Sequence, residues 1–331
     1  MTTSARDPRT RVAVIGGGAS CEHEVSLASA AAVAAALDPE RYDVVRLTID
    51  PHGTWFDGGD RPVGLTGAVC LLRRCDVVLP VVHGPHGEDG TLAALCELAG
   101  LPYVGSGVGA GALAMDKWAT KLVAEAVGVS TAPGVLLTTR DRAAYRWSRP
   151  IVVKPVASGS SHGVALVADA ADLDAALDAA FALDSRVLVE DVVVGREIDV
   201  AILGRPDGSR FVAPALEIVT DGLFDYDDKY GGQADFRIPA DLHEPDRKAL
   251  DDAALAVYDA LGCDGVARVD FFVTDDGPVL NEVNTMPGFT EHSQAPKMFA
   301  AAGLPYAALL DLLVRDALEA AGGGRGSMTG P

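Results

Sequence analysis

The sequence predicts an α/β protein that begins with a doubly wound parallel sheet. Short runs of β-branched residues alternate with Ala- and Leu-rich stretches along the whole chain, as strands followed by helices do. The first of these runs ends in Gly16-Gly17-Gly18 and is followed by helical sequence. With 331 residues, of which 49% are hydrophobic, the chain is long enough for two or three domains, each with its own core.

The N-terminal third supplies the strand–helix alternation of this sheet, which continues to about Gly105. The expected strands cover residues 11–18, 42–50 and 75–84. One expected helix ends near Leu37, and another covers residues 87–100. Glu88 and Asp89 would lie in the first turn of the second helix, where carboxylates favour the helix dipole.

Beyond the N-terminal third, a helix is expected over residues 115–128, with Gly128 ending it. Two strands follow at 151–155 and 164–167, joined by the loop VASGSSHG. The remaining expected elements are helices over 172–181 and 245–261 and strands over 186–193, 197–203, 210–219, 268–273 and 279–284. The glycine-rich tail is expected to be disordered.

The composition excludes several classes of protein. A formal charge of -20 argues against nonspecific nucleic-acid binding, which requires a basic surface. No stretch approaches the ~20 apolar residues of a membrane helix, and the first apolar run is too short for a secretory leader. The five cysteines form no CxxC motif, which fits a reduced cytoplasm without zinc. We therefore expect a cytoplasmic protein that binds neither nucleic acid nor membrane.

Two glycine-rich segments differ from the common nucleotide-binding loops. A GxGxxG fingerprint starting at Gly16 would need glycine at Cys21, which disfavours a nicotinamide oxidoreductase. The loop ASGSSHG lies between two strands and lacks the Walker pattern. With Lys154 just upstream, its serines and accessible N–H groups predict a flap over phosphates; a solvated hairpin loop has the same composition and stays the alternative.

The last two strands predict a hairpin with one polar face. Pairing Val273 with Val279 places Asp270 directly opposite Glu282. Opposed carboxylates repel each other unless something positive lies between them. Magnesium typically takes one or two carboxylates together with substrate phosphates, so this pair predicts a magnesium platform.

The same pairing places Arg268 opposite Asn284 on that face. The carboxamide would join Asp270 and Glu282 as a metal ligand, and the guanidinium would bind a developing negative charge beside them. A polar, solvent-facing strand without any ion shows the same alternation and is the alternative.

Several other charged residues lie at element edges or in polar loops. Lys117, Lys154 and Lys229 are individually typical of surface lysines, but together with the carboxylate hairpin and the serine loop they predict phosphate ligands. Glu190 and Glu197 lie where a strand ends, and there glutamates can accept from an adenine amino group and a ribose hydroxyl. Surface charge is the alternative for both glutamates.

The motifs taken in order resemble those of one family, D-alanine–D-alanine ligase, an ATP-grasp enzyme of peptidoglycan precursor synthesis. The resemblance runs from about Arg11 to Val314 through GGGASCEHEVS, HGPHGEDG, LPYVGSGVGAGALAMDK, VVKPVASGSSHGV, FDYDDKY, ARVDFF and LNEVNTMPGFTEHS. It implies a three-domain ATP-grasp architecture: an N-terminal α/β domain over 1–105, a central subdomain over 106–197 and a C-terminal subdomain over 198–331. It also implies a homodimer.

The resemblance implies a role for each matching residue in binding ATP and metal. Lys117, Lys154 and Lys229 would contact phosphates, with Ser160 and Ser161 in the flap, while Glu190 and Glu197 would hold adenine and ribose. Asp270, Glu282 and Asn284 would ligate two Mg²⁺ ions, which Mn²⁺ can replace.

The resemblance likewise implies residues that bind the amino acids. Glu22 would receive the ammonium of the first D-alanine, with His83 nearby, and Ser160 and Tyr230 would join Glu22 in a link that closes the lid. Arg268 and the backbone N–H of Gly288 would form the oxyanion site, and Ser293 would hold the second carboxylate. The segment from Thr220 to Pro239 and the Ser160 loop are the expected lids, because water would destroy an acyl phosphate.

One departure from the family pattern concerns the second substrate. Gln294 stands where members often carry an apolar residue near the second methyl group, so D-serine or another polar D-amino acid is an alternative to D-alanine. Tyr230 favours the dipeptide-forming branch over the D-lactate-forming one. A nucleotide-binding regulatory protein without catalytic activity is the alternative from another class.

Overall fold

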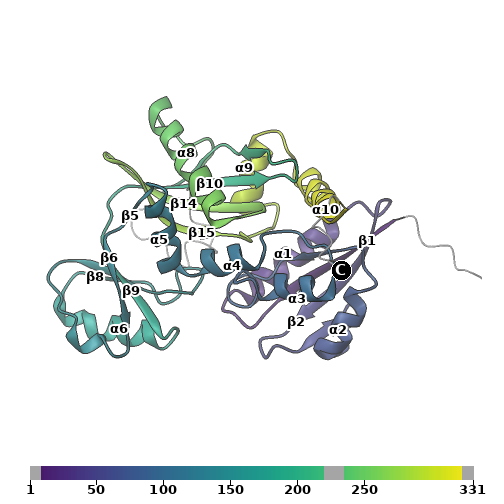
Figure 1. Ribbon diagram of the computed structural model, residues 1–331, viewed down its shortest axis with the longest axis horizontal. Coiled ribbons are helices and arrows are strands. Elements are labelled where there is room, and N and C mark those ends of the chain that lie inside the picture. The colour runs from purple at the N-terminus through teal and green to yellow at the C-terminus, as the bar shows by residue number, and fades with distance from the viewer. Residues whose placement is uncertain (1–8, 220–234, 323–331) are drawn as a thin grey trace, which may run out of the picture.

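The computed structural model describes residues 9–219 and 235–322, which form three β-sheets with helices packed around them. Figure 1 shows the N-terminal sheet at one end, the C-terminal sheet in the middle and a smaller sheet, coloured teal, at the other end. The fold matches the mixed α/β, ATP-grasp architecture expected from the sequence. The three predicted domain ranges stay predictions, and the boundary after residue 197 falls inside a strand.

The N-terminal sheet has the order β3-β2-β1-β4. β1, β2 and β4 run parallel, as the doubly wound pattern predicted, and the short β3 is antiparallel to β2. Its elements are β1 (Thr10–Gly17), α1 (His23–Ala36), β2 (Tyr42–Ile49), β3 (Trp55–Asp57), α2 (Gly64–Leu72), β4 (Val77–Pro80) and α3 (Thr91–Ala99). The third predicted strand is shorter than expected, because β4 ends at Pro80.

The start of α3 corrects one prediction. The helix begins at Thr91 after Gly90, whose φ of 87° only glycine adopts readily, so Glu88 and Asp89 precede the first turn. These two carboxylates therefore do not act on the helix dipole from within the helix. They lie in the loop that connects β4 to α3.

The smaller central sheet has the order β6-β9-β7-β8 and is antiparallel throughout. It contains β6 (Gly134–Thr138), β7 (Ile151–Pro155), β8 (Ala165–Val167) and β9 (Arg186–Asp191), with α6 (Leu173–Phe181) and the 3₁₀ turns η1 (Arg142–Ala144) and η2 (Ala170–Asp172). β7 and β8 form the predicted pair around the serine loop. Its apolar core, which includes Val153, Leu177 and Val187, is a cluster of its own.

The C-terminal sheet has the order β13-β12-β10-β14-β15-β5, with β11 paired to β10. Its strands are β5 (Ser130–Thr131), β10 (Arg196–Gly204), β11 (Arg210–Val212), β12 (Leu216–Val219), β13 (Asp235–Arg237), β14 (Gly265–Thr274) and β15 (Gly277–Asn284). The helices around it are α4 (Val108–Met115), α5 (Lys117–Ala126), α8 (Glu244–Leu261), α9 (Gln294–Ala301) and α10 (Tyr306–Gly322). α5 ends before Gly128, near the predicted end.

The hairpin of β14 and β15 confirms the two predicted cross-strand pairs. Asp270 is the Cα partner of Glu282, and Arg268 is the partner of Asn284. Because side chains alternate along a strand, these four residues lie on the same face of the sheet.

The other end of this hairpin differs from the prediction by one residue. Val273 pairs with Pro278, not with Val279. The register shifts between the two ends, which leaves Asn281 as an extra residue on β15 and makes a β-bulge beside the carboxylate pair.

One apolar core joins the two ends of the chain. Val12 and Val14 of β1 belong to the same buried cluster as Leu309, Leu310 and Leu313 of α10. α10 contacts both α1 and β4, and Figure 1 shows it beside the N-terminal sheet. Among the described residues, no single helix is both long and apolar enough to cross a bilayer; α9 and α10 reach that length only together, across a bend of 101°.

Candidate active site

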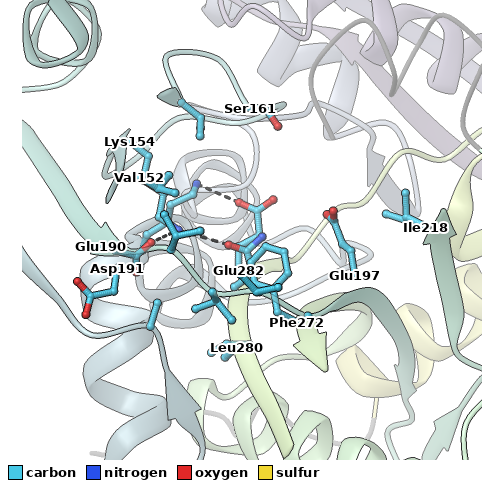
Figure 2. Close-up of a pocket in the computed structure, with 18 of the residues that line it drawn as sticks. Val152, Lys154, Ser161, Glu190, Asp191, Glu197, Ile218, Phe272, Leu280 and Glu282 are labelled. Atoms are coloured by element: carbon cyan, nitrogen blue, oxygen red, sulfur yellow. Dashed lines mark hydrogen bonds and ion pairs between the residues drawn. The ribbon is translucent and has the colours of Figure 1, made fainter. Parts of the chain in front are cut away.

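The larger cavity, about 790 Å³, lies between the central and C-terminal sheets. We call it the nucleotide cavity. Figure 2 shows Lys154 and Glu190 on one side, Glu282 in the middle and Glu197 on the other side. The predicted nucleotide-binding residues that line it are Lys117, Lys154, Ser161, Glu190 and Glu197.

Glu190 is buried between two lysines in this cavity. Its carboxylate oxygens lie 2.5 Å from Lys121 Nζ and 2.5 Å from Lys154 Nζ. Burial alone would raise the pKa of Glu190, but Lys154 and Lys121 bring it below its usual value. Lys154 Nζ also donates to Asn281 Oδ1 at 3.3 Å, so the bulged residue reaches the same cluster.

Lys117 begins α5 and bridges the serine loop and the hairpin. Its Nζ donates to the Ser158 carbonyl at 2.6 Å and lies 3.1 Å from Glu282 Oε2. Two lysines, Lys117 and Lys154, thus line the cavity beside the Gly/Ser loop, which is an arrangement suited to a polyphosphate.

A second cavity of about 440 Å³ adjoins the first. We call it the amino-acid cavity. Glu282 lines both cavities and so forms their common wall. The predicted site residues that line the amino-acid cavity are Glu22, His83, Ser160, Arg268, Asn284, Gly288, Ser293 and Gln294.

Glu22 lies just before α1 and is 8% exposed. Ser160 Oγ donates to its Oε1 at 2.5 Å, which is the Glu22–Ser160 link that the resemblance implied. Its Oε2 is buried and has no hydrogen-bond partner among the described residues. A Cβ at Gly159 would lie 2.2 Å from that oxygen, so any larger residue there would displace the Glu22 carboxylate. Ser160 and Ser161 take φ angles of 48° and 56°, which are strained for serine.

His83 is buried near Glu22, and both ring nitrogens have partners. Nδ1 is 2.9 Å from the Met286 carbonyl, which only accepts, so Nδ1 carries the proton. Nε2 then accepts from Ser29 Oγ at 3.0 Å. Burial lowers the pKa of His83, which keeps the ring neutral. A neutral imidazole adds no positive charge that would pair with Glu22 or repel a cationic ligand.

Glu88 is a site residue that the sequence analysis did not identify. Its carboxylate accepts from the backbone N–H groups of Gly84 at 2.7 Å and Met286 at 3.0 Å, and so ties the loop after β4 to the segment after β15. Burial, together with the nearby Glu22, raises the pKa of Glu88 to about 8. Glu88 therefore holds a proton more tightly than an exposed glutamate does, because its charged form is buried beside another carboxylate.

Three carboxylates occupy one row across the C-terminal sheet. Asp270 is the Cα partner of both Asp199 on β10 and Glu282 on β15. Arg268 binds Asp270 through Nε and Nη2, each at 2.7 Å, and its Nε lies 3.4 Å from Asp199 Oδ2. Burial, with Asp270 beside it, raises the pKa of Asp199 well above its usual value. Asp199 was also not identified from sequence.

The donor set of this row fits magnesium shared with phosphate. Among residues 9–219 and 235–322, no three His, Cys, Asp or Glu side chains form a metal-binding cluster, so the protein offers no complete cage. Two carboxylates and a carboxamide leave the other positions to phosphate oxygens, as magnesium sites do. Asn284 currently donates its Nδ2 to Asp270 at 3.0 Å, so its amide would have to turn to ligate an ion.

The remaining predicted residues divide between the described and undescribed parts of the chain. Ser293 precedes α9 at the N-cap position without a side-chain cap bond. Its Oγ accepts from Thr290 N at 3.1 Å, and a Cβ at Gly288 would lie 3.2 Å from that oxygen. Lys229 and Tyr230 lie outside the described residues, as does most of the predicted lid. Lys121 was missed, although it is one helical turn after Lys117 and so faces the same side.

Two sheets, one antiparallel and one antiparallel except for the β15–β5 pair, enclose a lysine-lined cavity, and one of them carries carboxylates of the kind that bind metal. This arrangement defines an ATP-grasp protein. Family models described as D-ala D-ala ligase N-terminus and C-terminus match residues 11–68 and 64–106, and residues 130–315. The chain belongs to the D-alanine–D-alanine ligase family.

Individual relatives show how far the likeness extends. The D-alanine–D-alanine ligase of Mycobacterium sp. (strain KMS) is 41% identical over 95% of this chain and 98% of its own. The VanG D-Ala:D-Ser ligase from Enterococcus faecalis has a TM-score of 0.81 at 34% identity, covering 93% of this chain and 99% of its own. The D-alanine–D-alanine ligase from Bacillus anthracis complexed with ATP has a TM-score of 0.78 at 30% identity, covering 95% and 99%.

Proposed function

We propose that the protein joins two D-alanine molecules into D-alanyl-D-alanine and converts ATP to ADP and phosphate, for peptidoglycan precursor synthesis. The first carboxylate attacks the γ-phosphate to give an acyl phosphate, and the amine of the second D-alanine then displaces the phosphate. Membership of the family and the relatives named above support this reaction.

The observation that carries the proposal is the buried Oε2 of Glu22, which has no hydrogen-bond partner within residues 9–219 and 235–322. An ionised oxygen without a partner is costly inside a protein, and the ammonium group of an amino acid would satisfy it. The amino-acid cavity shares Glu282 with the nucleotide cavity, so a substrate held at Glu22 lies next to a bound phosphate chain. Such adjacency is what a phosphoryl transfer from ATP to a carboxylate requires.

Each remaining residue then has a defined task. Lys117, Lys154 and Lys229 bind phosphate oxygens, with Ser161 of the loop, and Glu190 and Glu197 hold adenine and ribose. Ser160 and Tyr230 link to Glu22, and His83 lies near the first substrate. Arg268 and the backbone N–H of Gly288 stabilise the oxyanion of the second step, and Ser293 holds the second carboxylate.

We propose Asp270, Glu282 and Asn284 as ligands of two magnesium ions, for which manganese can substitute. When bound, the metal neutralises charge on the transferring phosphoryl group. We also propose a cytoplasmic homodimer that binds neither nucleic acid nor membrane.

Phosphate release and product analysis test this function. The purified protein, ATP and Mg²⁺ are incubated with D-alanine, D-serine, D-lactate or their mixtures, and the products are separated by mass. We expect release with D-alanine alone and a product of the mass of D-alanyl-D-alanine. A mixed D-alanyl-D-serine product as the main species would instead identify a D-Ala:D-Ser ligase. ATP binding without release would support a regulatory protein.

A further inference from the structure

We propose that Gln294 is a positioning residue for Arg268: its carboxamide ties the guanidinium to Asp199 and so fixes helix α9 to the carboxylate row. The inference rests on the proposed function only in its kinetic part, because the contact itself is structural. It concerns the position at which the chain departs from the family pattern.

The contacts of Gln294 reach two ionisable residues, Arg268 at the cavity wall and the buried Asp199. Its Oε1 accepts from Arg268 Nη1 at 2.6 Å, and its Nε2 donates to Asp199 Oδ2 at 2.9 Å. Gln294 is the first residue of α9, directly after Ser293. The bridge therefore connects the start of α9, next to Ser293, which is proposed to hold the second substrate, to the sheet face formed by β10 and β14.

The chemistry of the partners fixes the orientation of the amide. A guanidinium only donates, so the oxygen of Gln294 must face Arg268. The nitrogen then faces Asp199, whose carboxylate accepts. If the amide were reversed, its Nε2 would face the donor Nη1 of Arg268 and its Oε1 would face the acceptor Oδ2 of Asp199. Both hydrogen bonds would be lost, which is costly away from water.

Gln294 differs from the other partners of Arg268. The guanidinium otherwise contacts the carboxylates of Asp270 and Asp199, and Asp270 is proposed to ligate metal. Gln294 is uncharged and belongs to no proposed metal ligand set. Its bond to Nη1 therefore positions the guanidinium without using a carboxylate oxygen that a metal ion would bind. Arg268 can then still donate to the proposed oxyanion.

The same contacts bear on the second substrate. Each polar atom of the Gln294 carboxamide already has a buried, charged partner, so the side chain has a structural use that does not involve a hydroxyl of D-serine. Discrimination between D-alanine and D-serine then does not depend on Gln294. This replaces the expectation that a polar residue here favours a polar acceptor.

The test uses the full-length protein and a swap of the two hydrogen-bonding groups. Gln294→Met keeps the length of the side chain and removes both bonds, and we expect kcat for dipeptide formation to fall about 10-fold with an unchanged KM for ATP. Gln294→Glu, which places a carboxylate against Asp199, should fall at least as far. The double variant Gln294→Glu/Asp199→Asn restores one donor and one acceptor at unchanged net charge, and should regain most of the activity.

Three further readouts distinguish positioning from other roles. In Gln294→Met, kcat/KM for D-serine divided by kcat/KM for D-alanine, each as second substrate, should stay within about twofold of the wild-type ratio. A ratio changed about 10-fold would show that Gln294 selects the second substrate and would overturn the proposal. Wild-type kcat in Gln294→Met, or no rescue in the double variant, would also overturn it. A crystal structure of Gln294→Met should show Arg268 displaced; an unmoved guanidinium would contradict the proposal without reference to activity.

Two controls separate this inference from the proposed function. Glu291→Gln, an exposed change in the same loop, should behave as wild type. If the wild-type protein itself forms no dipeptide, the proposed function fails, while the position of Arg268 in the variant crystal still decides the structural inference.

Discussion

The nucleotide and amino-acid cavities differ in how their buried charges are balanced. In the nucleotide cavity the carboxylates are matched by lysines: Glu190 lies between Lys121 and Lys154, and Glu282 pairs with Lys117. In the amino-acid cavity Glu22 and Glu88 line the wall together with Arg268, whose guanidinium is also paired with Asp270 and Asp199. One oxygen of Glu22 and one of Asp199 have no hydrogen-bond partner among the described residues.

This difference indicates which charge each cavity lacks. Lysines that are paired with carboxylates can exchange them for phosphate oxygens at little electrostatic cost. An excess of buried carboxylates, by contrast, raises pKa values and calls for a cation. The comparison therefore supports the proposal that the first cavity binds the polyphosphate and the second the ammonium group, and three substitutions test it.

The largest effect is expected at Glu282, because it lines both cavities. Glu282→Gln removes a proposed metal ligand and the partner of Lys117, and D-alanine-dependent phosphate release should fall about 10²–10³-fold. Asp276→Asn, in the exposed turn before β15, is the matched control. Unchanged turnover in Glu282→Gln would remove the metal assignment.

A smaller, selective effect is expected at Glu22. Glu22→Gln keeps the shape but removes the charge, so KM for the first D-alanine should rise about 10–100-fold while KM for ATP stays within about twofold. Glu24 is exposed in the first turn of α1, and Glu24→Gln should leave both KM values unchanged. Initial rates at varied D-alanine and ATP measure this. An equal loss of ATP affinity would erase the contrast between the cavities.

The smallest effect is a change in how stability depends on pH. Glu88 has a pKa of about 8 in the folded protein against a usual value of 4.5, so the folded state binds more protons between these values. Its contribution is fully present below about pH 4.5 and is lost as the pH rises through about 8. In urea unfolding from pH 5 to 9, the free energy of wild type relative to Glu88→Gln should fall as pH rises. A difference independent of pH would show that Glu88 titrates normally.

The sequence predicted the sheets, the serine loop and the opposed carboxylates, because alternation along strands is a local property. It missed the bulge at Asn281, since one extra residue leaves the pattern on either side intact. It also placed the start of α3 too early, because Glu88 and Asp89 have the composition of a first turn.

The rest of the site depends on contacts between distant segments. Gln294 lies 95 residues from Asp199, and nothing in the local sequence indicates that bridge. Lys121 resembles a surface lysine until the central sheet brings Glu190 against it. Asp199 had a usable signal, because it follows Glu197 at the spacing that puts both on one face of β10.

The placement of α10 has a consequence for how the protein is made. This helix covers β1 and β4 from the far end of the chain, and Leu309, Leu310 and Leu313 complete the core that Val12 and Val14 begin. α1 contributes Val33 and Leu37 to the same core, but the core on this face stays incomplete until α10 has been synthesised. The central sheet, by contrast, can close as soon as its own residues have left the ribosome. Among the described elements, the first strand to be synthesised thus has its core completed by the last helix.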